Sequence, residues 1–381
     1  MAKKLEKVKW AKFKIGDLFE KIKVNRLPYK TSELSSIYKE NFTLPVLTAG
    51  IQNQGLNNYA NIEGATILKN VISISANGAN TGATFYQKNE FTILQDAYAI
   101  KWIFTDNVLT DNQYLYFVAS ISKILHGKYE WTNKAGWEKV KEEKIQLPIK
   151  NDGSIDFEFM TGFISELEAC QISKLEAYLV ITGFSDYVLT FEEKKILEIF
   201  RKDEIEWKEF KIRDLFEVNS YKKRFDANKV NILEKGHPYV VRTALNNGIR
   251  GYLEEDEKFL NDGNTISFGQ DTATMFYQEK PYFTGDKIKI IKSKYKEFNK
   301  LNSHFFVSAM AKSFSMFAWG SSSFNINIIE NQEIYLPIKN NEIDFKFIEM
   351  LILAIQKDII KDVVLYTDKK IKVAKKVISN K

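Results

Sequence analysis

The sequence predicts an α+β fold of two β-rich domains in a pseudo-twofold arrangement, separated by two long antiparallel helices that form a coiled-coil spacer. Three observations lead to this expectation. The phrase Trp-x-x-Phe-Lys-Ile-x-Asp-Leu-Phe-Glu occurs at 10–20 and again at 207–217. Each copy is followed by strand-like segments broken by Asn, Gly and Asp, and each ends in a long stretch with helical periodicity.

The two copies stay in step along their whole length. Recurring segments include Phe-Tyr-Gln at 85–87 and 276–278, Leu-Pro-Ile-Lys at 147–150 and 336–339, and Ile-Asp-Phe at 155–157 and 343–345. A period of about 190 residues is too long for a solenoid, so one domain with its linker has been duplicated. The predicted boundaries are 1–152 for the first domain, 153–183 for the first spacer helix, 184–206 for a linker with a short helix, 207–341 for the second domain and 342–381 for the second spacer helix.

Length and composition suit two ordinary intracellular domains. The 381 residues allow two cores, and the single cysteine excludes an intramolecular disulfide. With no leader and no run of 18 or more apolar residues, we expect a soluble, cytoplasmic protein. The net charge of +6 favours nucleic acid only weakly, because an AT-rich genome would equally enrich lysine. Only six residues are arginine, the side chain that can address guanine through two hydrogen bonds.

Within each domain, strands are expected on both sides of a polar turn. In the first copy the strands are 71–75 and 83–86; in the second they are 265–268 and 274–277. Short helices are predicted at 113–124 and 303–314, ahead of the closing Leu-Pro-Ile strands.

The stretch after each Leu-Pro-Ile segment has helical spacing. Asp156 and Asp344 stand where an N-cap belongs. Thr190 with Glu193 has the spacing of a capping box and predicts a short helix up to Arg201. The apolar seam of the second long helix comprises Ile348, Ile352, Ile355, Ile359, Val363, Tyr366, Val373 and Val377, and that of the first Met160, Ile164, Leu167, Gln171, Leu175 and Tyr178. These seams favour packing of the two helices on each other, although each helix could instead cover its own domain.

No catalytic or metal site is expected in this chain. The three histidines lack Cys or carboxylate neighbours at metal-ligand spacing, and one cysteine cannot form a zinc cluster. Phosphate loops, Gly-x-Ser-x-Gly elbows and the Asp-Pro-Pro-Tyr or Asn-Pro-Pro-Phe tetrads of amino-methyltransferases are absent from the sequence.

The chain resembles the specificity subunit of Type I restriction-modification systems and the similar subunits of related bipartite-site systems. The resemblance rests on the duplicated opening phrase, the turn before each Phe-Tyr pair, the segment 320–326, the Leu-Pro-Ile exits and the long helix after each. The first copy departs from the pattern at 127–131, where the Ser-rich stretch is missing.

The resemblance implies a non-catalytic DNA-binding protein. Each β-rich part would be a target recognition domain that reads one half of a split sequence in double-stranded DNA. The antiparallel helices would dock two adenine methyltransferase (M) subunits, which would hold the S-adenosylmethionine, and translocase/nuclease (R) subunits can join. No cofactor is expected in this chain itself.

The expected helices also set a distance between the two DNA contacts. Helices over 157–182 and 345–378 would be about 39 and 51 Å long at a rise of about 1.5 Å per residue. At about 3.4 Å per base pair, the half-sites would lie roughly 11 to 15 base pairs apart. Since DNA has twofold axes perpendicular to its length, two pseudo-symmetric domains can meet opposite strands in the same way. The two domains differ in sequence, so the target should be asymmetric.

Candidate DNA-binding residues are polar side chains on loops that can enter a groove. In the second domain they are Arg242, Asn246, Asn247, Arg250, Gln270, Asp271, Ser321, Ser322, Ser323 and Asn325. In the first domain they are Gln52, Asn53, Gln54, Asn57, Asn58, Asn77, Asn80, Lys128 and Tyr129. Asn-Gly segments can equally be plain turn formers, and the aromatic side chains can equally pack inside the domain. The apolar residues of the opening phrase are assigned to the core or to the joint between domain and helix.

Two other functions fit the sequence less well. One is a two-domain adaptor that binds proteins, and the other is a nuclease or methyltransferase with an unrecognised site.

Overall fold

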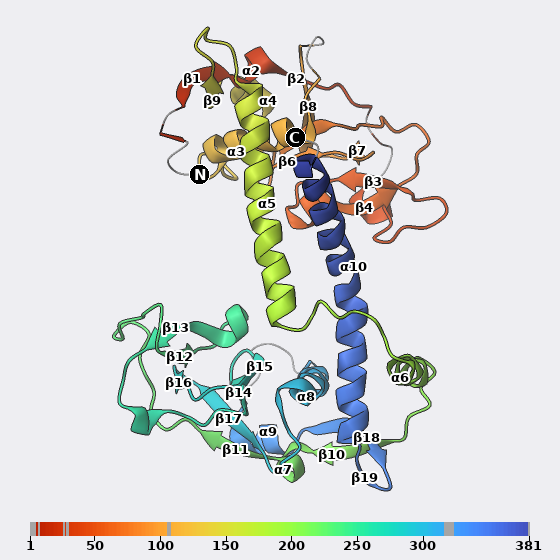
Figure 1. Cartoon of the computed structure of the whole chain (residues 1–381), viewed down its shortest axis with the longest axis vertical. Helices are drawn as coiled ribbons and strands as arrows, with labels where there is room; N and C mark the ends of the chain where they lie inside the picture. Colours follow the sequence, from red (N-terminus) through yellow and green to blue (C-terminus); the bar gives the residue numbers. More distant parts are fainter. Residues whose placement is uncertain are drawn as a thin grey trace. The chain divides into compact units, whose positions relative to one another are not determined.

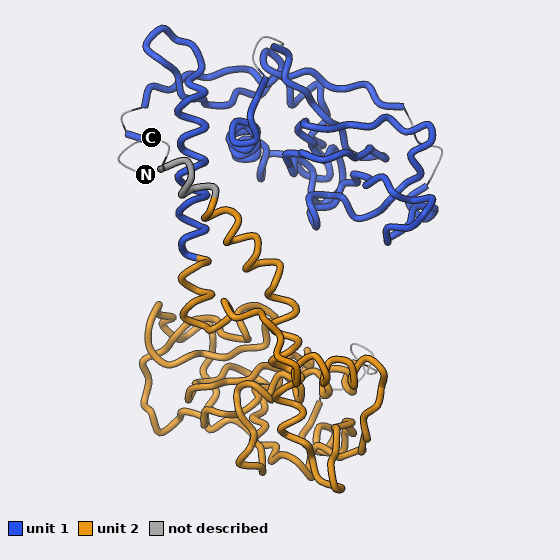
Figure 2. The backbone as a smooth tube through the Cα atoms, turned by 45° about the vertical axis from the view of Figure 1, so that its right-hand side comes forward, with its two compact units in different colours: residues 1–174 blue, residues 175–381 orange. Residues whose placement is uncertain are grey.

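The computed structural model describes residues 5–6, 8–25, 27, 30–104, 108–315 and 324–379, with the side chains of 373–379 left out. The chain divides into two compact units, residues 1–174 and residues 175–381 (Figure 2). Each unit is described by itself below.

The first unit contains three small sheets (Figure 1). Strand β1 (Lys9–Lys14) pairs antiparallel with β9 (Lys144–Ile149). The central sheet has the order β2-β8-β5-β6, with bounds Phe19–Lys21, Ala97–Trp102, Val71–Ser75 and Thr84–Gln87. The third sheet has the order β4-β3-β7, with bounds Leu56–Ala60, Leu44–Leu47 and Thr92–Ile93, and β3 pairs parallel with β7. The helices are α2 (Ile15–Leu18), α3 (Asp111–Leu125), α4 (Trp137–Val140) and the start of α5 (Phe157–Ile181).

The second unit repeats this topology and adds one short strand, β19. The central sheet has the order β11-β17-β14-β15, with bounds Phe216–Ser220, Ile288–Ser293, Thr265–Gly269 and Met275–Gln278. The sheet β13-β12-β16 spans Ile249–Leu253, His237–Val240 and Phe283–Thr284, again with one parallel pairing. Strands β10 (Trp207–Lys211), β18 (Glu333–Lys339) and β19 (Glu342–Ile343) form the third sheet. The helices of the second unit are α6 (Phe191–Arg201), α7 (Ile212–Leu215), α8 (Lys300–Phe314), α9 (Ile326–Glu330) and α10 (Phe345–Ser379). The predicted duplication is confirmed.

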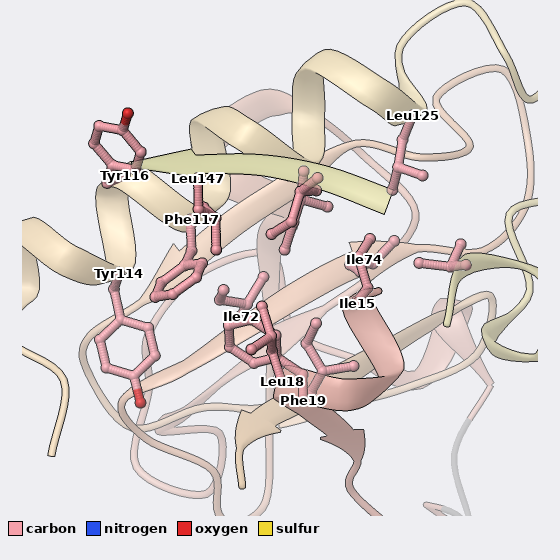
Figure 3. Close-up of a cluster of buried hydrophobic side chains, with 14 of the residues drawn as sticks. Ile15, Leu18, Phe19, Ile72, Ile74, Tyr114, Tyr116, Phe117, Leu125 and Leu147 are labelled. Carbon is pink, nitrogen blue, oxygen red and sulfur yellow. The ribbon is translucent and has the colours of Figure 1, made fainter. Parts of the chain in front are cut away.

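The repeated opening phrase builds the core of each unit. Ile15, Leu18 and Phe19 are at most 3% exposed and pack beneath α3 (Figure 3). The ring of Phe19 meets Phe117 edge-to-face, with ring centroids 5.2 Å apart. In the second unit the equivalent Phe216 is 1% exposed and makes the same kind of contact with rings from α8 and from the segment before it. The predicted core role of the phrase is confirmed, since aromatic pairs of this geometry add to the free energy of burial.

The predicted helix starts are also confirmed. Asp156 Oδ1 accepts a hydrogen bond from the Phe159 amide at 2.9 Å, and Asp344 Oδ1 does the same at the start of α10. Thr190 and Glu193 form the reciprocal capping box of α6. Glu193 then bonds to Lys357 of α10, whose side chain is only 16% exposed. The second unit therefore includes the linker helix α6, anchored to α10.

A left-handed turn follows β3 in the first unit and β12 in the second. The backbone φ angles are 46°, 56° and 83° at 53–55, and 47°, 52° and 78° at 246–248. Asn53 Nδ2 donates to the Leu56 carbonyl at 2.7 Å, and Asn246 Nδ2 donates to the Ile249 carbonyl at 3.0 Å. Asparagine tolerates this backbone region better than most residues, which explains its use at both positions.

A buried glutamine fastens each of these turns to the central sheet. Gln278 Nε2 donates to the Asn247 carbonyl at 3.0 Å and to Ser267 Oγ at 3.1 Å. Gln87 Nε2 makes the equivalent bonds to the carbonyl of residue 54 and to Ser73 Oγ, both at 3.0 Å. Both glutamines are no more than 4% exposed, so water does not replace these bonds readily.

We predict that Gln278→Met destabilises the second unit by about 1–3 kcal/mol, because methionine keeps the volume but leaves a buried carbonyl and a buried hydroxyl without their donor. Hydrogen exchange of the amides at 246–253 measures the loss within this unit. Gln54→Met, at an exposed position of the first unit, is the matched control and should change protection there by less than about 0.5 kcal/mol. Undiminished protection in Gln278→Met would contradict the role assigned to this side chain.

Candidate nucleic-acid interface

Three of the chain's six arginines line one hollow in the second unit. Arg224, Arg242 and Arg250 share a space of about 390 Å³ with Asp226 and Asp286. Arg242 follows the end of β12, Arg250 lies on β13, and the backbone of Arg224 bridges to β16. The pairing of three strands therefore gathers arginines that are up to 26 positions apart in the sequence.

Carboxylates hold two of these arginines in place. Arg242 pairs with Asp271 through one guanidinium nitrogen and lies 3.8 Å from Asp286 through the other. Arg224 lies 3.6 Å from Asp286, and Lys287 lies 3.0 Å from Asp271. The side chains in these pairs are 30–52% exposed, so each pair contributes little stability and acts mainly by orienting the arginines.

The floor of the hollow is a buried tyrosine. Tyr239 is fully buried, and its hydroxyl donates to the Phe225 carbonyl at 2.7 Å. Burial raises the pKa of Tyr239 above its ordinary value, so the hydroxyl stays protonated and neutral. The charges facing the hollow therefore come from the arginine and aspartate side chains around its rim.

A glycine makes room for Arg242. A Cβ added at Gly269 would lie 3.3 Å from Cγ of Arg242 and within 2.7 Å of the hydroxyls of Thr272 and Thr274. The aliphatic part of Arg242 thus lies beside Gly269. A larger residue at position 269 would require the neighbouring threonine side chains to move. The equivalent position in the first unit is Ser75, where the facing residue is Ala49.

Recurring backbone hydrogen bonds establish which positions are equivalent in the two units. Three backbone bonds have direct counterparts. The bond from Thr48 N to Gly55 O matches that from Val241 N to Gly248 O, and the bond from Leu94 N to Leu47 O matches that from Gly285 N to Val240 O. The bond from Ala76 N to Asp96 O matches that from Gln270 N to Lys287 O. The equivalent positions around the hollow are Ala49 and Arg242, Asn57 and Arg250, Asn77 and Asp271, Gln95 and Asp286, and Asp96 and Lys287. The backbone is common to both units, whereas the side chains that project from it differ at every pair.

One side-chain contact occurs at equivalent positions within each unit, although the residue types differ. In the first unit Asn77 Nδ2 donates to Asp96 Oδ1 at 2.8 Å. In the second unit the same two positions form the ion pair of Asp271 with Lys287. The turn before the Phe-Tyr pair is thus tied to the same neighbour by an amide in one unit and by a salt bridge in the other.

The structure assigns turn or packing contacts to several other predicted residues. Asn53 and Asn246 close the left-handed turns, and Asn325 caps α9 by accepting a hydrogen bond from the Ile328 amide at 3.0 Å. Gln270 donates its amide to the Phe324 carbonyl at 2.8 Å. Each of these side chains stabilises a turn, a helix start or a packing contact within its own unit.

The pair Lys128 and Tyr129 belongs to the edge of the first core. Tyr129 is only 8% exposed and donates to Glu143 Oε1 at 2.8 Å, while Lys128 forms an ion pair with the other carboxylate oxygen at 2.6 Å. Burial and the nearby carboxylate raise the pKa of Tyr129, so this hydroxyl also stays protonated. Packing, one of the two alternatives for this aromatic residue, is what the structure shows.

The remaining predicted residues divide by exposure. Gln52, Gln54, Asn57 and Asn247 are exposed, whereas Asn58 and Asn80 are half-buried. Ser321, Ser322 and Ser323 lie outside the described residues. Three charged side chains of the hollow, Arg224, Asp226 and Asp286, were not among the predicted site residues. They are far from Arg242 in the sequence, and only the parallel pairing at β16 brings them beside it.

Neither a metal centre nor a membrane span appears in the part of the chain that the structure describes. No group of three or more His, Cys, Asp or Glu side chains is placed there to hold a metal ion. Among the same residues, no helix combines the length and the apolar composition that crossing a bilayer requires.

The duplicated domain matches a known family in both copies. The family model for the Type I restriction modification DNA specificity domain matches residues 7–177 and 204–365. The chain is also similar to the specificity subunit S.BcgI of the Type II restriction enzyme BgcI from Heyndrickxia coagulans, with 31% identity over 153 residues. That match covers 40% of this chain and 44% of the relative, so it spans less than half of either protein.

A solved structure shows the same fold across nearly the whole chain. The S subunit of a Type-I restriction-modification system from M. genitalium superposes with a TM-score of 0.57 at 14% identity, covering 98% of this chain and 95% of that one. At this identity the likeness concerns the fold alone. The two family matches are the stronger finding, because together they cover most of the sequence and coincide with the two structural copies. The chain therefore belongs to the Type I restriction-modification DNA specificity family, as a non-catalytic specificity component that carries the DNA specificity domain twice.

Proposed function

We propose that this protein reads an asymmetric, bipartite site in double-stranded DNA, one half with each unit. The observation that carries the proposal is the common backbone with different side chains at the equivalent positions around the hollow. A shared scaffold presents its recognition residues in the same orientation to DNA, and different residues then select different bases. A duplication whose copies had to recognise the same sequence would have no reason to differ at all five pairs.

The exposure of Arg250 and the fixed orientation of Arg242 suit contacts with DNA bases. Arg250 is exposed, and among the described residues no carboxylate forms a salt bridge with it. Arg242 is half-buried and fixed by two carboxylates, so its guanidinium has a defined direction. A fixed planar fork favours bidentate contact with guanine, whereas a phosphate contact needs only a mobile positive charge.

The long helices would set the distance between the half-sites. Helix α5 has 25 residues and α10 has 35. At a rise of about 1.5 Å per residue these lengths are about 38 and 53 Å. If the helices lie antiparallel as a coiled-coil spacer, the half-sites are separated by roughly 11 to 16 base pairs, given about 3.4 Å per base pair.

The same helices are the proposed docking surface for two adenine methyltransferase subunits, which would supply the S-adenosylmethionine. Support comes from Leu353 and Leu365, two large apolar side chains that α10 leaves exposed and that do not belong to the predicted seam. The exposed Ile359, Val363 and Tyr366 belong to that seam, which the coiled-coil spacer would cover. Nuclease or translocase subunits would join this complex through the methyltransferases or beside them.

We predict that Arg250→Ala weakens binding to the cognate DNA by about 1–3 kcal/mol and relaxes the preference at one base pair, in one half-site only. The physical reason is the loss of two hydrogen bonds to a single guanine. Selection from randomised DNA, followed by titration of the selected duplex, measures both effects.

Arg213→Ala is the matched control for this prediction. Arg213 lies in the same unit, bonds to Asn331 Oδ1 at 3.0 Å and does not line the hollow. Its replacement removes one positive charge and should leave the base preference unchanged. If Arg250→Ala instead weakens binding equally to every sequence, Arg250 contacts phosphate.

A second prediction separates a specificity subunit from an enzyme. The purified chain, given S-adenosylmethionine and genomic DNA, should transfer no methyl group. Addition of its methyltransferase subunits should produce N6-methyladenine at a gapped, asymmetric motif, detected by sequencing of methylated bases. Methyl transfer by the chain alone would favour the enzyme alternative, and complexes that bind proteins but no DNA would favour the adaptor.

A further inference from the structure

Four of the five equivalent positions around the hollow are charged in the second unit and neutral in the first. In the second unit the five residues are Arg242, Arg250, Asp271, Asp286 and Lys287. In the first unit three of the five are amides, one is alanine and one is aspartate: Asn57, Asn77, Gln95, Ala49 and Asp96. The exception is Lys287, whose counterpart Asp96 carries the opposite charge.

The two sets suit different base pairs. An arginine fork carries donors only, and guanine is the base that presents two adjacent acceptors, N7 and O6, in the major groove. An asparagine or glutamine amide carries a donor beside an acceptor, which matches N7 and N6 of adenine. Charged forks therefore favour G·C pairs, and amides favour A·T pairs.

The residues that would make these contacts are available in both units. Arg250 on β13 and its counterpart Asn57 on β4 are both exposed. Asp286 lies 3.8 Å from Arg242 and can accept a hydrogen bond from N4 of the cytosine paired to a guanine. Its counterpart Gln95 is exposed and follows β7, the strand that pairs with β3, by two residues.

Packing supports the assignment independently of charge. The stem of Arg242 lies beside Gly269, 3.3 Å from a Cβ built at that position. In the first unit Ser75 stands at the position of Gly269, and its hydroxyl donates to the Ala49 carbonyl at 3.4 Å. The arginine and glycine of one unit are thus replaced together by alanine and serine in the other.

We propose that the second unit reads a half-site with an obligatory G·C pair, through Arg250 and the carboxylate-held Arg242, and that the first unit reads its half-site through A·T pairs, with Asn57 and Gln95 as specificity-determining residues. This inference rests on the proposed function, because it requires that the hollow of the second unit and the equivalent positions of the first unit face DNA. It adds the class of base pair that each unit selects and names the first-unit residues responsible.

The test is selection from double-stranded DNA randomised over 30 base pairs, using the full chain assembled with its adenine methyltransferase subunits. The wild-type complex should select two separated half-motifs, of which one contains an invariant G·C pair and the other is defined by A·T pairs. Arg250→Asn should change the G·C position towards A·T and weaken binding to the original duplex by about 5- to 150-fold, the range for one bidentate contact. The other half-motif should stay unchanged.

The reciprocal variant tests the first unit. Asn57→Arg should move one A·T position of the other half-motif towards G·C. Asn57→Ala, which only removes the amide, should relax that same position and guards against a misfolded arginine variant. Circular dichroism and hydrogen exchange of the first unit confirm the fold of both variants.

The outcomes separate the two levels of inference. A wild-type complex that selects no gapped motif would overturn the proposed function. A gapped motif that Arg250→Asn leaves intact, or in which Asn57→Ala relaxes the G·C half, would overturn the assignment of base pairs while the proposed function stands.

Discussion

The buried side-chain amide of Gln278 holds the left-handed turn after β12 against the central sheet of the second unit, and Gln87 does the same for the turn after β3 in the first. Each amide joins a turn carbonyl and a serine hydroxyl that lie on different segments. Because the turn adopts a left-handed backbone at three successive residues, it would not keep this shape without such support. The strand that leaves the turn carries Asn57 or Arg250, so the direction of these side chains depends on the glutamine.

The charged hollow of the second unit combines opposite charges, which is unlike a plain phosphate-binding surface. A purely basic surface would bind any DNA sequence, because phosphate contacts carry no information about bases. Asp271 and Asp286 offset part of the positive charge and direct the guanidinium of Arg242. Lower affinity for random DNA and a defined orientation of the donors both favour discrimination over affinity.

Much of the fold followed from the sequence, because its signals are local. The aspartate N-caps of α5 and α10, the capping box of α6 and the buried Phe19 and Phe216 all depend on short-range spacing or on the repeat. The site was only partly predictable. Arg242 and Arg250 lie close in the sequence and were recognised together, but Arg224 joins them only through the bridge to β16. Asn53 and Asn246 form turn-closing bonds that the sequence could not distinguish from a base-reading role, because a turn-forming amide and a base-reading amide have the same sequence signature.

The place of Gly269 beneath Arg242 constrains how the specificity of this unit can evolve. A Cβ at position 269 would first meet the hydroxyls of Thr272 and Thr274, at 2.6 and 2.7 Å, and then the Arg242 stem at 3.3 Å. A larger residue there would therefore displace the turn after β14 and the arginine together, so substitutions at these positions should be non-additive. A change in the base preference of this unit would then require coordinated replacements on both segments.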